Sequence, residues 1–253
     1  MIAISLQSGS NGNCIYVETN GVNLLFDAGI SGIEAERRLA ALGRNIEQID
    51  ALIISHDHAD HIRYAGVYQR KYGLPIYITP RTLYKAEKEK MLGKLYDVVY
   101  YLPGGQIPFG DVSVRTIPTP HDAIDGVAFV VSSGRKKLGI LTDLGHPFKE
   151  LISVVSSLDA VFIESNFDHG MLESGPYPSF LKKRIKGPGG HLSNRDAANL
   201  LQAGTNLKWA CLAHLSEKNN SPSVALRTHI EIANPNLTFY TAHRYRSTDL
   251  LIV

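Results

Sequence analysis

The chain has 253 residues, of which 44% are hydrophobic and 20% are charged, a composition typical of a folded protein with a sizeable core. Its formal net charge of +2 is too small to indicate nucleic-acid binding by itself, so any basic surface must be local. Only two cysteines are present, Cys14 and Cys211, which excludes a disulfide-rich fold and favours a reducing compartment.

The segment Met1–Gln7 lacks the charged leader and apolar run of a signal peptide. No apolar stretch approaches the roughly 18 to 20 residues that a membrane span needs. We therefore expect a cytoplasmic protein without membrane association. Length alone leaves open one large α/β domain or two small ones.

The first quarter of the chain predicts short strands over 2–6, 14–18 and 22–26. Asn20-Gly21, between the last two, is typical of a two-residue hairpin. A helix is expected from about Gly32 to Leu42, with Gly43 as the glycine after its end. The apolar run Ala51–Ile54 indicates a strand buried on both faces, in the middle of a sheet.

Helices and strands alternate through most of the remaining chain, although 97–141 is mostly strand and turn. Helices are expected over 62–72, 81–90, 147–156, 195–202 and 223–232. Strands are expected over 76–78, 112–117, 127–131, 137–141, 160–163, 209–212 and 237–240. This order predicts an α/β fold with two sheets packed face to face and helices outside both. We expect one domain over 1–253, with Gly187–Gly190 as an internal loop.

A cluster of histidines and aspartates, His56-Asp57-His58-Ala59-Asp60-His61, directly follows the buried strand. Catalytic groups of α/β proteins gather at such strand ends. A lone loop histidine is usually structural, but that interpretation must here account for three at once. Neutral imidazoles and carboxylates bind Zn²⁺ and related ions. The spacing lets His56 and His58 converge on one ion while Asp60 and His61 turn toward a second.

Four further positions each follow a strand-like run, namely Asp27, His121, Asp143 and His214. An aspartate or histidine at a strand end is more often structural than functional, so each position alone is weak. Together with the cluster they predict a metal-dependent hydrolase.

These positions resemble, in order, the five motifs of the metallo-β-lactamase superfamily. The resemblance implies a four-layer αββα sandwich with two divalent ions, Zn or Mn, at the edge of the sheets. It implies that His56, His58 and His121 bind one ion, and that Asp60, His61 and His214 bind the other. Asp143 would bridge the ions and Asp27 would orient their ligands. A hydroxide between the ions would be the nucleophile, with Asp60 part of the catalytic centre.

Two branches of the superfamily are disfavoured by particular residues. The best-known β-lactamases have a cysteine at the position of Asp143. The β-CASP nucleases have a large extra domain after the bridging aspartate, and the stretch 144–213 is too short for one.

Glu164-Ser165-Asn166 and Gly190-His191-Leu192-Ser193-Asn194 resemble segments of the superfamily's tRNA 3′-processing nucleases. The resemblance implies that His191 is a general acid for the leaving oxygen and that Glu164 supports it. Ser193 and Asp196 form a capping pattern, which places His191 just before a helix. The alternative is a structural loop histidine.

A closer resemblance is to the YycJ/WalJ group of bacterial DNA exonucleases. It rests on Ser8–Asn13, Phe26–Gly29, the two segments above and His214-Leu215-Ser216. It implies a 5′-to-3′ exonuclease acting on double-stranded DNA ends. One departure is Phe167, where that group has a histidine; His169 is displaced by two residues.

Five side chains are candidate contacts for substrate phosphates: Ser10, Asn11, Lys183, Arg184 and Arg195. The alternatives are a tight turn for the first pair and a solvated basic face for the rest. A small-molecule hydrolase that cleaves a thioester, lactone or cyclic phosphodiester at the same metal site remains a second hypothesis. A binding module with a degenerate metal site is a third. The sequence leaves the oligomeric state open.

Overall fold

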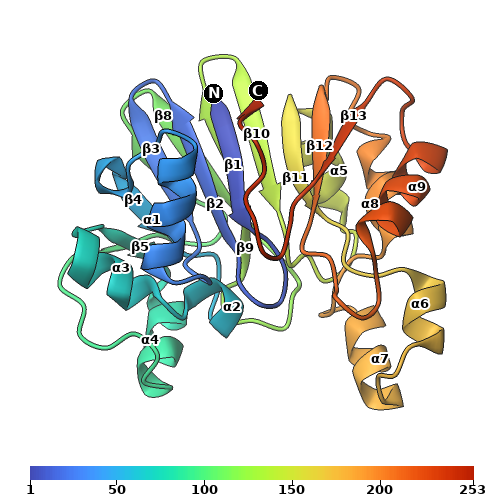
Figure 1. The fold of residues 1–253 in the computed structure, drawn as a ribbon, viewed down its shortest axis with the longest axis horizontal. Helices are drawn as coiled ribbons and strands as arrows, with labels where there is room; N and C mark the ends of the chain where they lie inside the picture. The colour runs from blue at the N-terminus through green and yellow to red at the C-terminus, as the bar shows by residue number, and fades with distance from the viewer.

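The computed structural model describes residues 1–253 and shows two seven-stranded sheets packed face to face (Figure 1). The first sheet has the order β14 (Leu251–Ile252), β1 (Ile2–Gln7), β2 (Cys14–Thr19), β3 (Val22–Phe26), β4 (Ala51–Ile53), β5 (Ile76–Ile78) and β6 (Val98–Tyr100). The second has the order β13 (Thr238–Thr241), β12 (Trp209–Ala213), β11 (Ala160–Glu164), β10 (Lys136–Leu141), β9 (Val127–Ser133), β8 (Val112–Pro118) and β7 (Gln106–Phe109).

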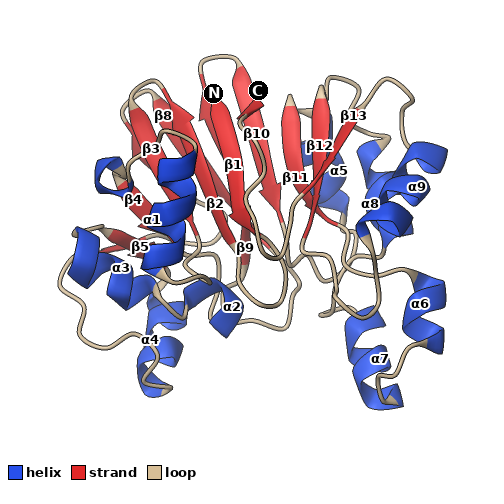
Figure 2. Ribbon diagram, in the orientation of Figure 1, coloured by secondary structure: helices blue, strands red, loops and turns tan.

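Helices lie outside both sheets (Figure 2), which confirms the predicted αββα sandwich. Beside the first sheet are α1 (Gly32–Ala41), the short 3₁₀ helix η1 (Ile46–Gln48), α2 (Ala59–Ile62), α3 (Ala65–Tyr72) and α4 (Pro80–Lys88). Beside the second are α5 (Lys149–Ser156), α6 (His169–Ser174), α7 (Ser179–Lys186), α8 (Asn194–Leu201) and α9 (Pro222–Ile232). None of these helices combines the length and apolar character needed to cross a lipid bilayer.

Three apolar clusters hold the layers together. The inner cluster joins the two sheets, and its Phe26 and Phe129 rings lie with centroids 5.0 Å apart. One outer cluster packs α1, α3 and α4 on the first sheet, and the other packs α5, α8 and α9 on the second. Burial of these side chains is the main favourable contribution to folding. Cys14 and Cys211 are both buried and unpaired, in different clusters, as expected.

Several local predictions are confirmed. Strand β4 lies between β3 and β5, parallel to both, and all three of its residues are buried. Asn20 and Gly21 form the β2–β3 hairpin with φ values of 49° and 76°. Gly43 has a left-handed φ of 70° just after α1, and Ser193 forms a capping box with Asp196 at α8.

Other elements differ from the predictions. The helix expected over 62–72 begins only at Ala65, as α3, because the chain breaks at Tyr64, whose amide donates to the carbonyl of Ala28; the residues before this break form the separate short helix α2. This break keeps Asp60 and His61 on their own short helix. Helices α6 and α7 and strand β14 were not expected. Few apolar residues of α6 and α7 are buried, Leu172 and Ile185 among them, so their periodic signal is weak.

Candidate metal centre

The predicted metal ligands lie at one edge of the sandwich. In the first sheet, β3 and β4 are parallel, and Asp27 and the His56 cluster follow their carboxyl ends. In the second, β10, β11 and β12 are parallel to one another. Asp143 follows β10, Glu164 is the last residue of β11, and His214 follows β12. Strand β8 runs in the same direction, because it and β10 are both antiparallel to β9, and His121 follows it. The strand ends of both sheets that precede these residues lie at the edge of the sandwich near α2 (Figure 1).

The first triad contains His56, His58 and His121, whose ligand atoms all lie within 4.8 Å of one another. Nε2 of His121 is 3.3 Å from Nδ1 of His58. His121 donates from Nδ1 to the carbonyl of Gly190 at 2.8 Å, which leaves the Nε2 lone pair free to bind an ion.

The second triad contains Asp60, His61 and His214, also within 4.8 Å. Oδ2 of Asp60 lies 3.6 Å from Nε2 of His61 and 3.5 Å from Nε2 of His214. Asp60 and His61 lie in the first turn of the short helix α2, which places both side chains beside His214.

Asp143 lies between the two triads. Its Oδ1 is 3.7 Å from Nε2 of His121 and 3.4 Å from Nδ1 of His214, and its Oδ2 is 3.2 Å from Nε2 of His61. Burial alone would raise the pKa of Asp143, but the neighbouring His214 and His61 outweigh burial and hold this pKa well below its usual range. A carboxylate in this position can contact ions in both triads.

The donor set fits divalent ions. Oδ2 of Asp143 and Nε2 of His56 are buried and have no hydrogen-bond partner. Buried polar atoms are normally satisfied, and these two face other potential ligands of the same site. Imidazole nitrogens with carboxylate oxygens are suited to Zn²⁺ and neighbouring transition metals.

Asp27 and Ser55 fix two histidine rings. Oδ2 of Asp27 accepts from Nδ1 of His61 at 2.7 Å and from the Ser55 hydroxyl at 2.9 Å. The Ser55 hydroxyl oxygen in turn accepts from Nδ1 of His56 at 2.9 Å. Both rings therefore turn Nε2 toward the ions' expected positions. Asp27 thus contacts His61, one of the predicted metal ligands, whereas Ser55 was not among the predicted site residues.

Three site residues have left-handed backbone conformations, Asp27, Asp143 and His214, with φ values of 64°, 55° and 53°. Such values are unusual for residues other than glycine and cluster at functional sites. Asp27 and His214 directly follow strands β3 and β12, and Asp143 comes two residues after the end of β10. The left-handed turn redirects the chain and brings the side chain over the sheet edge. Nothing in the sequence signals these conformations.

Asn13 and Gly29 also build the site. Asn13 donates from Nδ2 to Oδ2 of Asp60 at 3.2 Å, and the same nitrogen lies 2.9 Å from Nε2 of His61. A Cβ on Gly29 would lie 1.7 Å from the carbonyl oxygen of Asp60. Only glycine permits this approach, so the Gly29 of the Phe26–Gly29 motif places α2 against the loop after β3.

His191 and Glu164 are paired beside the triads. Nδ1 of His191 lies 2.6 Å from Oε1 of Glu164, and Oε2 of Glu164 accepts from the amides of Leu144 and Leu192. Burial alone would raise the pKa of Glu164, but His191 and a hydrogen bond with His214 outweigh it and lower this pKa to about 2. Glu164 is therefore a carboxylate that holds His191 by Nδ1. The predicted pairing is present.

Phe167, the departure from the exonuclease pattern, faces the protein interior. Its side chain is 2% exposed and packs with Leu172 and Ile185, joining α6 and α7 to the sandwich. His169 is exposed at the start of α6, and its ring lies edge-on to Phe167. Neither residue belongs to the triads.

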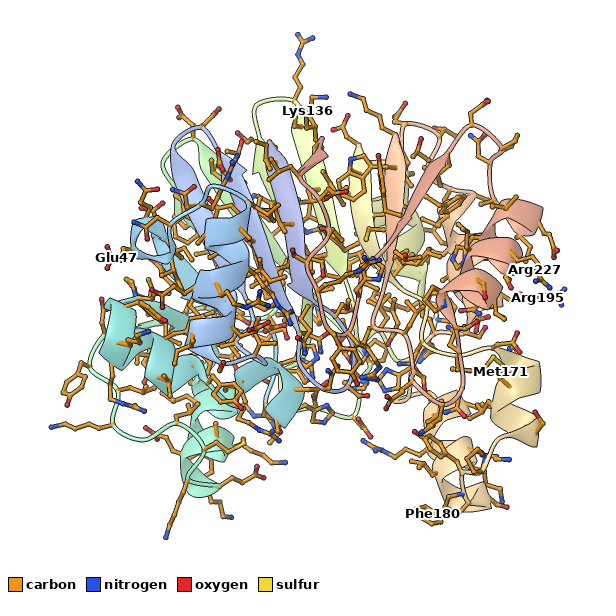
Figure 3. The ribbon with its side chains drawn as sticks, viewed as in Figure 1. Glu47, Lys136, Met171, Phe180, Arg195 and Arg227 are labelled. Carbon is orange, nitrogen blue, oxygen red and sulfur yellow. The ribbon has the colours of Figure 1, made fainter.

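The candidate phosphate contacts are dispersed. Arg184 on α7 pairs with Asp122 at 2.7 Å, and Asp122 in turn lies 3.5 Å from Nε2 of His121, so Arg184 borders the first triad. Lys183 is exposed on the same helix. Arg195 points outward near Arg227 (Figure 3), away from the site. Ser10 and Asn11 both accept hydrogen bonds from Arg244.

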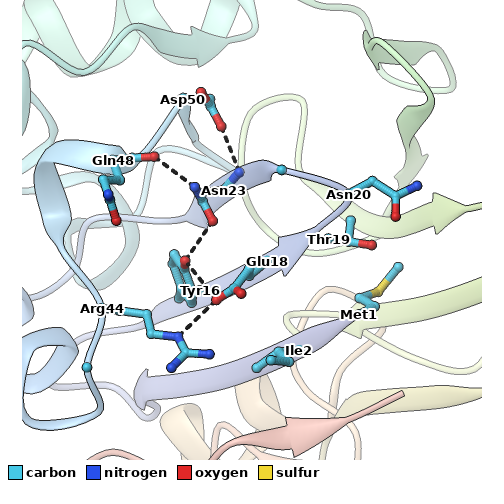
Figure 4. Close-up of a pocket in the computed structure, with 12 residues that line it drawn as sticks. Met1, Ile2, Tyr16, Glu18, Thr19, Asn20, Asn23, Arg44, Gln48 and Asp50 are labelled. Atoms are coloured by element: carbon cyan, nitrogen blue, oxygen red, sulfur yellow. Dashed lines mark hydrogen bonds and ion pairs between the residues drawn. The ribbon is translucent and has the colours of Figure 1, made fainter.

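A large surface hollow lies at the opposite end of the sandwich, by the N-terminus and the β2–β3 hairpin (Figure 4). Its polar groups satisfy one another. Arg44 pairs with Glu18 at 2.9 Å, Tyr16 donates to Asn23 at 2.8 Å, and the amide of Asn23 donates to Asp50. It contains no cluster of potential metal ligands, so the chemistry belongs to the histidine triads.

The fold and the site together define a class, and the chain belongs to the metallo-β-lactamase superfamily, whose family model matches residues 8–168. It is a metal-dependent hydrolase of that superfamily. Within it, the chain is 37% identical over 229 residues to Exodeoxyribonuclease WalJ of Streptococcus pneumoniae, covering 89% of this chain and 85% of the relative. It is 36% identical over 225 residues to Exodeoxyribonuclease YycJ of Bacillus anthracis, covering 87% and 84%. The resemblance to this group is therefore confirmed.

Among solved structures, the fold is similar to that of the metallo-β-lactamase fold protein YhfI from Bacillus subtilis, with a TM-score of 0.74. The superposition covers 98% of each chain at 16% sequence identity. At that identity the similarity supports the fold and carries no argument about substrate.

Proposed function

We propose that this protein is a two-metal phosphodiesterase that degrades double-stranded DNA from its ends in the 5′-to-3′ direction. The pairing of His191 with Glu164 beside the triads carries the proposal. When a phosphodiester is hydrolysed, the P–O bond to the leaving sugar oxygen breaks and this oxygen needs a proton, which a histidine held by a buried carboxylate can supply. The names of the two bacterial relatives support DNA as the substrate.

The two ions would be Zn²⁺ or Mn²⁺. His56, His58 and His121 would hold one, Asp60, His61 and His214 the other, and Asp143 would contact both. When bound, the ions would activate water and neutralise charge on the phosphate. Asp27, Ser55 and the Gly190 carbonyl keep Nδ1 of three histidines engaged, so that Nε2 of each is available.

His191 is the proposed general acid. Its Nδ1 is held by Glu164, so Nε2 is the nitrogen that can donate to the leaving oxygen. Its side chain is 20% exposed, whereas Glu164 is fully buried, so substrate can reach the histidine but not the carboxylate. Glu164 fixes the orientation of the ring.

A panel of substrates tests the proposal. The protein loaded with Mn²⁺, Zn²⁺ or Mg²⁺ should shorten linear duplex DNA, and EDTA should stop the reaction. Turnover of a thioester, lactone or cyclic phosphodiester, with no cleavage of duplex DNA, single strands or RNA, would instead support a small-molecule hydrolase.

A further inference from the structure

The C-terminal segment 242–248 runs alongside the end of β1, in the opposite direction, and reaches the loop Ser8–Asn13 (Figure 1). The amide of Thr248 donates to the Ser5 carbonyl at 2.9 Å, and the amide of Ser8 donates to the His243 carbonyl at 3.0 Å. These two bonds fix the segment at both ends. The side chain of Arg244 therefore extends from a well-anchored stretch of backbone.

The guanidinium of Arg244 is held in one orientation. Its Nη1 donates to Oδ1 of Asn11 at 2.7 Å and its Nη2 to the hydroxyl of Ser10 at 2.8 Å. Asn11 also donates from Nδ2 to the Arg244 carbonyl at 3.1 Å. The side chain lies against Gly9, where a Cβ would meet Cζ and Nη1 at 3.3 Å. Little rotamer freedom remains to be lost when the guanidinium binds a ligand.

The charge of Arg244 is not compensated within the protein. Both of its side-chain acceptors are neutral, and no carboxylate forms an ion pair with it. Each Nη atom carries a second N–H beyond the one that it donates to the loop. A fixed, uncompensated guanidinium fork matches the geometry of a phosphate.

The loop that holds Arg244 also contacts every residue of the second triad. Asn13 lies 3.2 Å from Oδ2 of Asp60 and 2.9 Å from Nε2 of His61. The amide of His214 donates to the hydroxyl of Ser8 at 2.8 Å. Arg244 is thus one short loop away from the second expected ion, at the rim of the site.

We propose that Arg244, held by Ser10 and Asn11, binds a backbone phosphate next to the one that is cleaved. This inference rests on the proposed function. It gives Ser10 and Asn11 a positioning role in place of the direct phosphate contact that the sequence suggested. The phosphate is either the terminal 5′-monophosphate or an internal phosphodiester, which share the same recognition chemistry.

The test compares kcat/KM on duplexes that carry a 5′-phosphate or a 5′-hydroxyl. Arg244→Ala should lower kcat/KM about tenfold or more, mainly through KM, because a phosphate contact is lost. Loss confined to the 5′-phosphorylated duplex identifies the terminal phosphate, and equal loss on both identifies an internal one. Arg244→Lys should recover part of the loss, because it keeps the charge but not the fork.

Arg227→Ala is the matched control, because it removes an exposed arginine on α9, away from the site. Ser10→Ala tests a purely structural role, since it loosens the loop but keeps the charge. If Arg244→Ala matches Arg227→Ala on both duplexes, or if Ser10→Ala costs as much as Arg244→Ala, the proposal is overturned. The affinity of these variants for a fluorescent 5′-phosphorylated duplex, measured in EDTA, gives the same comparison between Arg244→Ala and its controls without cleavage. It therefore separates failure of this inference from failure of the nuclease proposal.

Discussion

Nδ1 of His191 lies 2.6 Å from Oε1 of Glu164, although the two residues come from a loop and a strand far apart in the sequence. We propose that this contact holds His191 as a general acid, and replacement of His191 tests that role against a purely structural one. His191→Ala should lower kcat by about 10²-fold or more, because the leaving oxygen then lacks a proton donor. Metal content, measured by plasma emission spectrometry, should stay unchanged. Unaltered turnover would return His191 to a structural role.

Replacement of Glu164 should separate its catalytic contribution from its structural one. Glu164→Ala leaves the buried amides of Leu144 and Leu192 without an acceptor, at about 1–3 kcal/mol each. Glu164→Gln keeps an oxygen acceptor but removes the negative charge beside His191. Urea denaturation should show a larger loss of unfolding free energy for the alanine variant, while both variants lose kcat. A Gln variant with full activity would contradict the proposed support of His191.

Asp27 should affect metal affinity without contacting the ions. Its carboxylate accepts from the Ser55 amide and hydroxyl and from His61. Asp27→Asn places an amide nitrogen opposite one of these donors, so the His61 ring should lose its fixed orientation. We expect metal affinity to fall about 10- to 100-fold in a competitive chelator titration. Asp111→Asn, at an exposed aspartate, is the control and should leave affinity unchanged.

Metal binding should release protons. Burial alone would lower the pKa of His214, but Asp143, Asp60 and Glu164 outweigh burial and raise this pKa to about 10 in the ion-free protein. A protonated imidazole must lose its proton before it binds an ion, so metal affinity should rise with pH through the neutral range. Isothermal titration calorimetry in buffers of different ionisation enthalpy measures the protons released. An affinity independent of pH would contradict this assignment of His214.

His229 on α9 should make the fold less stable in acid. It is fully buried, and burial outweighs its hydrogen bond to the Ala225 carbonyl and lowers its pKa from 6.5 to about 4. Between these two pH values the unfolded chain binds more protons, so stability falls as the pH drops from 6.5 toward 4. The loss is at most about 3 kcal/mol. Urea denaturation of the EDTA-treated protein and of the EDTA-treated His229→Gln variant measures the free energy of unfolding at each pH. This free energy should depend less on pH in the variant. Identical pH profiles would refute this contribution.

Much of the fold and site could be predicted from the sequence because the signals are local. The run Ala51–Ile54 indicated a central strand, and the adjacent histidine cluster indicated metal binding. The roles of Asn13 and Ser55 could not be predicted, because they come from contacts between separate loops, Asn13 with Asp60 and Ser55 with Asp27. Arg244 reaches Ser10 from the opposite end of the chain, a contact that no periodicity encodes. The predicted single domain over 1–253 stays a prediction.

Time courses on linear duplex DNA, labelled at either the 5′ or the 3′ end, test the central claim most directly. With Mn²⁺ or Zn²⁺ bound, the 5′ label should be released first as a mononucleotide, while 3′-labelled strands shorten progressively. Asp143→Ala, which removes the carboxylate between the triads, should abolish both signals. Absence of cleavage of any DNA with Mn²⁺, Zn²⁺ or Mg²⁺ would contradict the assignment as a nuclease, and release of the 3′ label first would contradict its polarity.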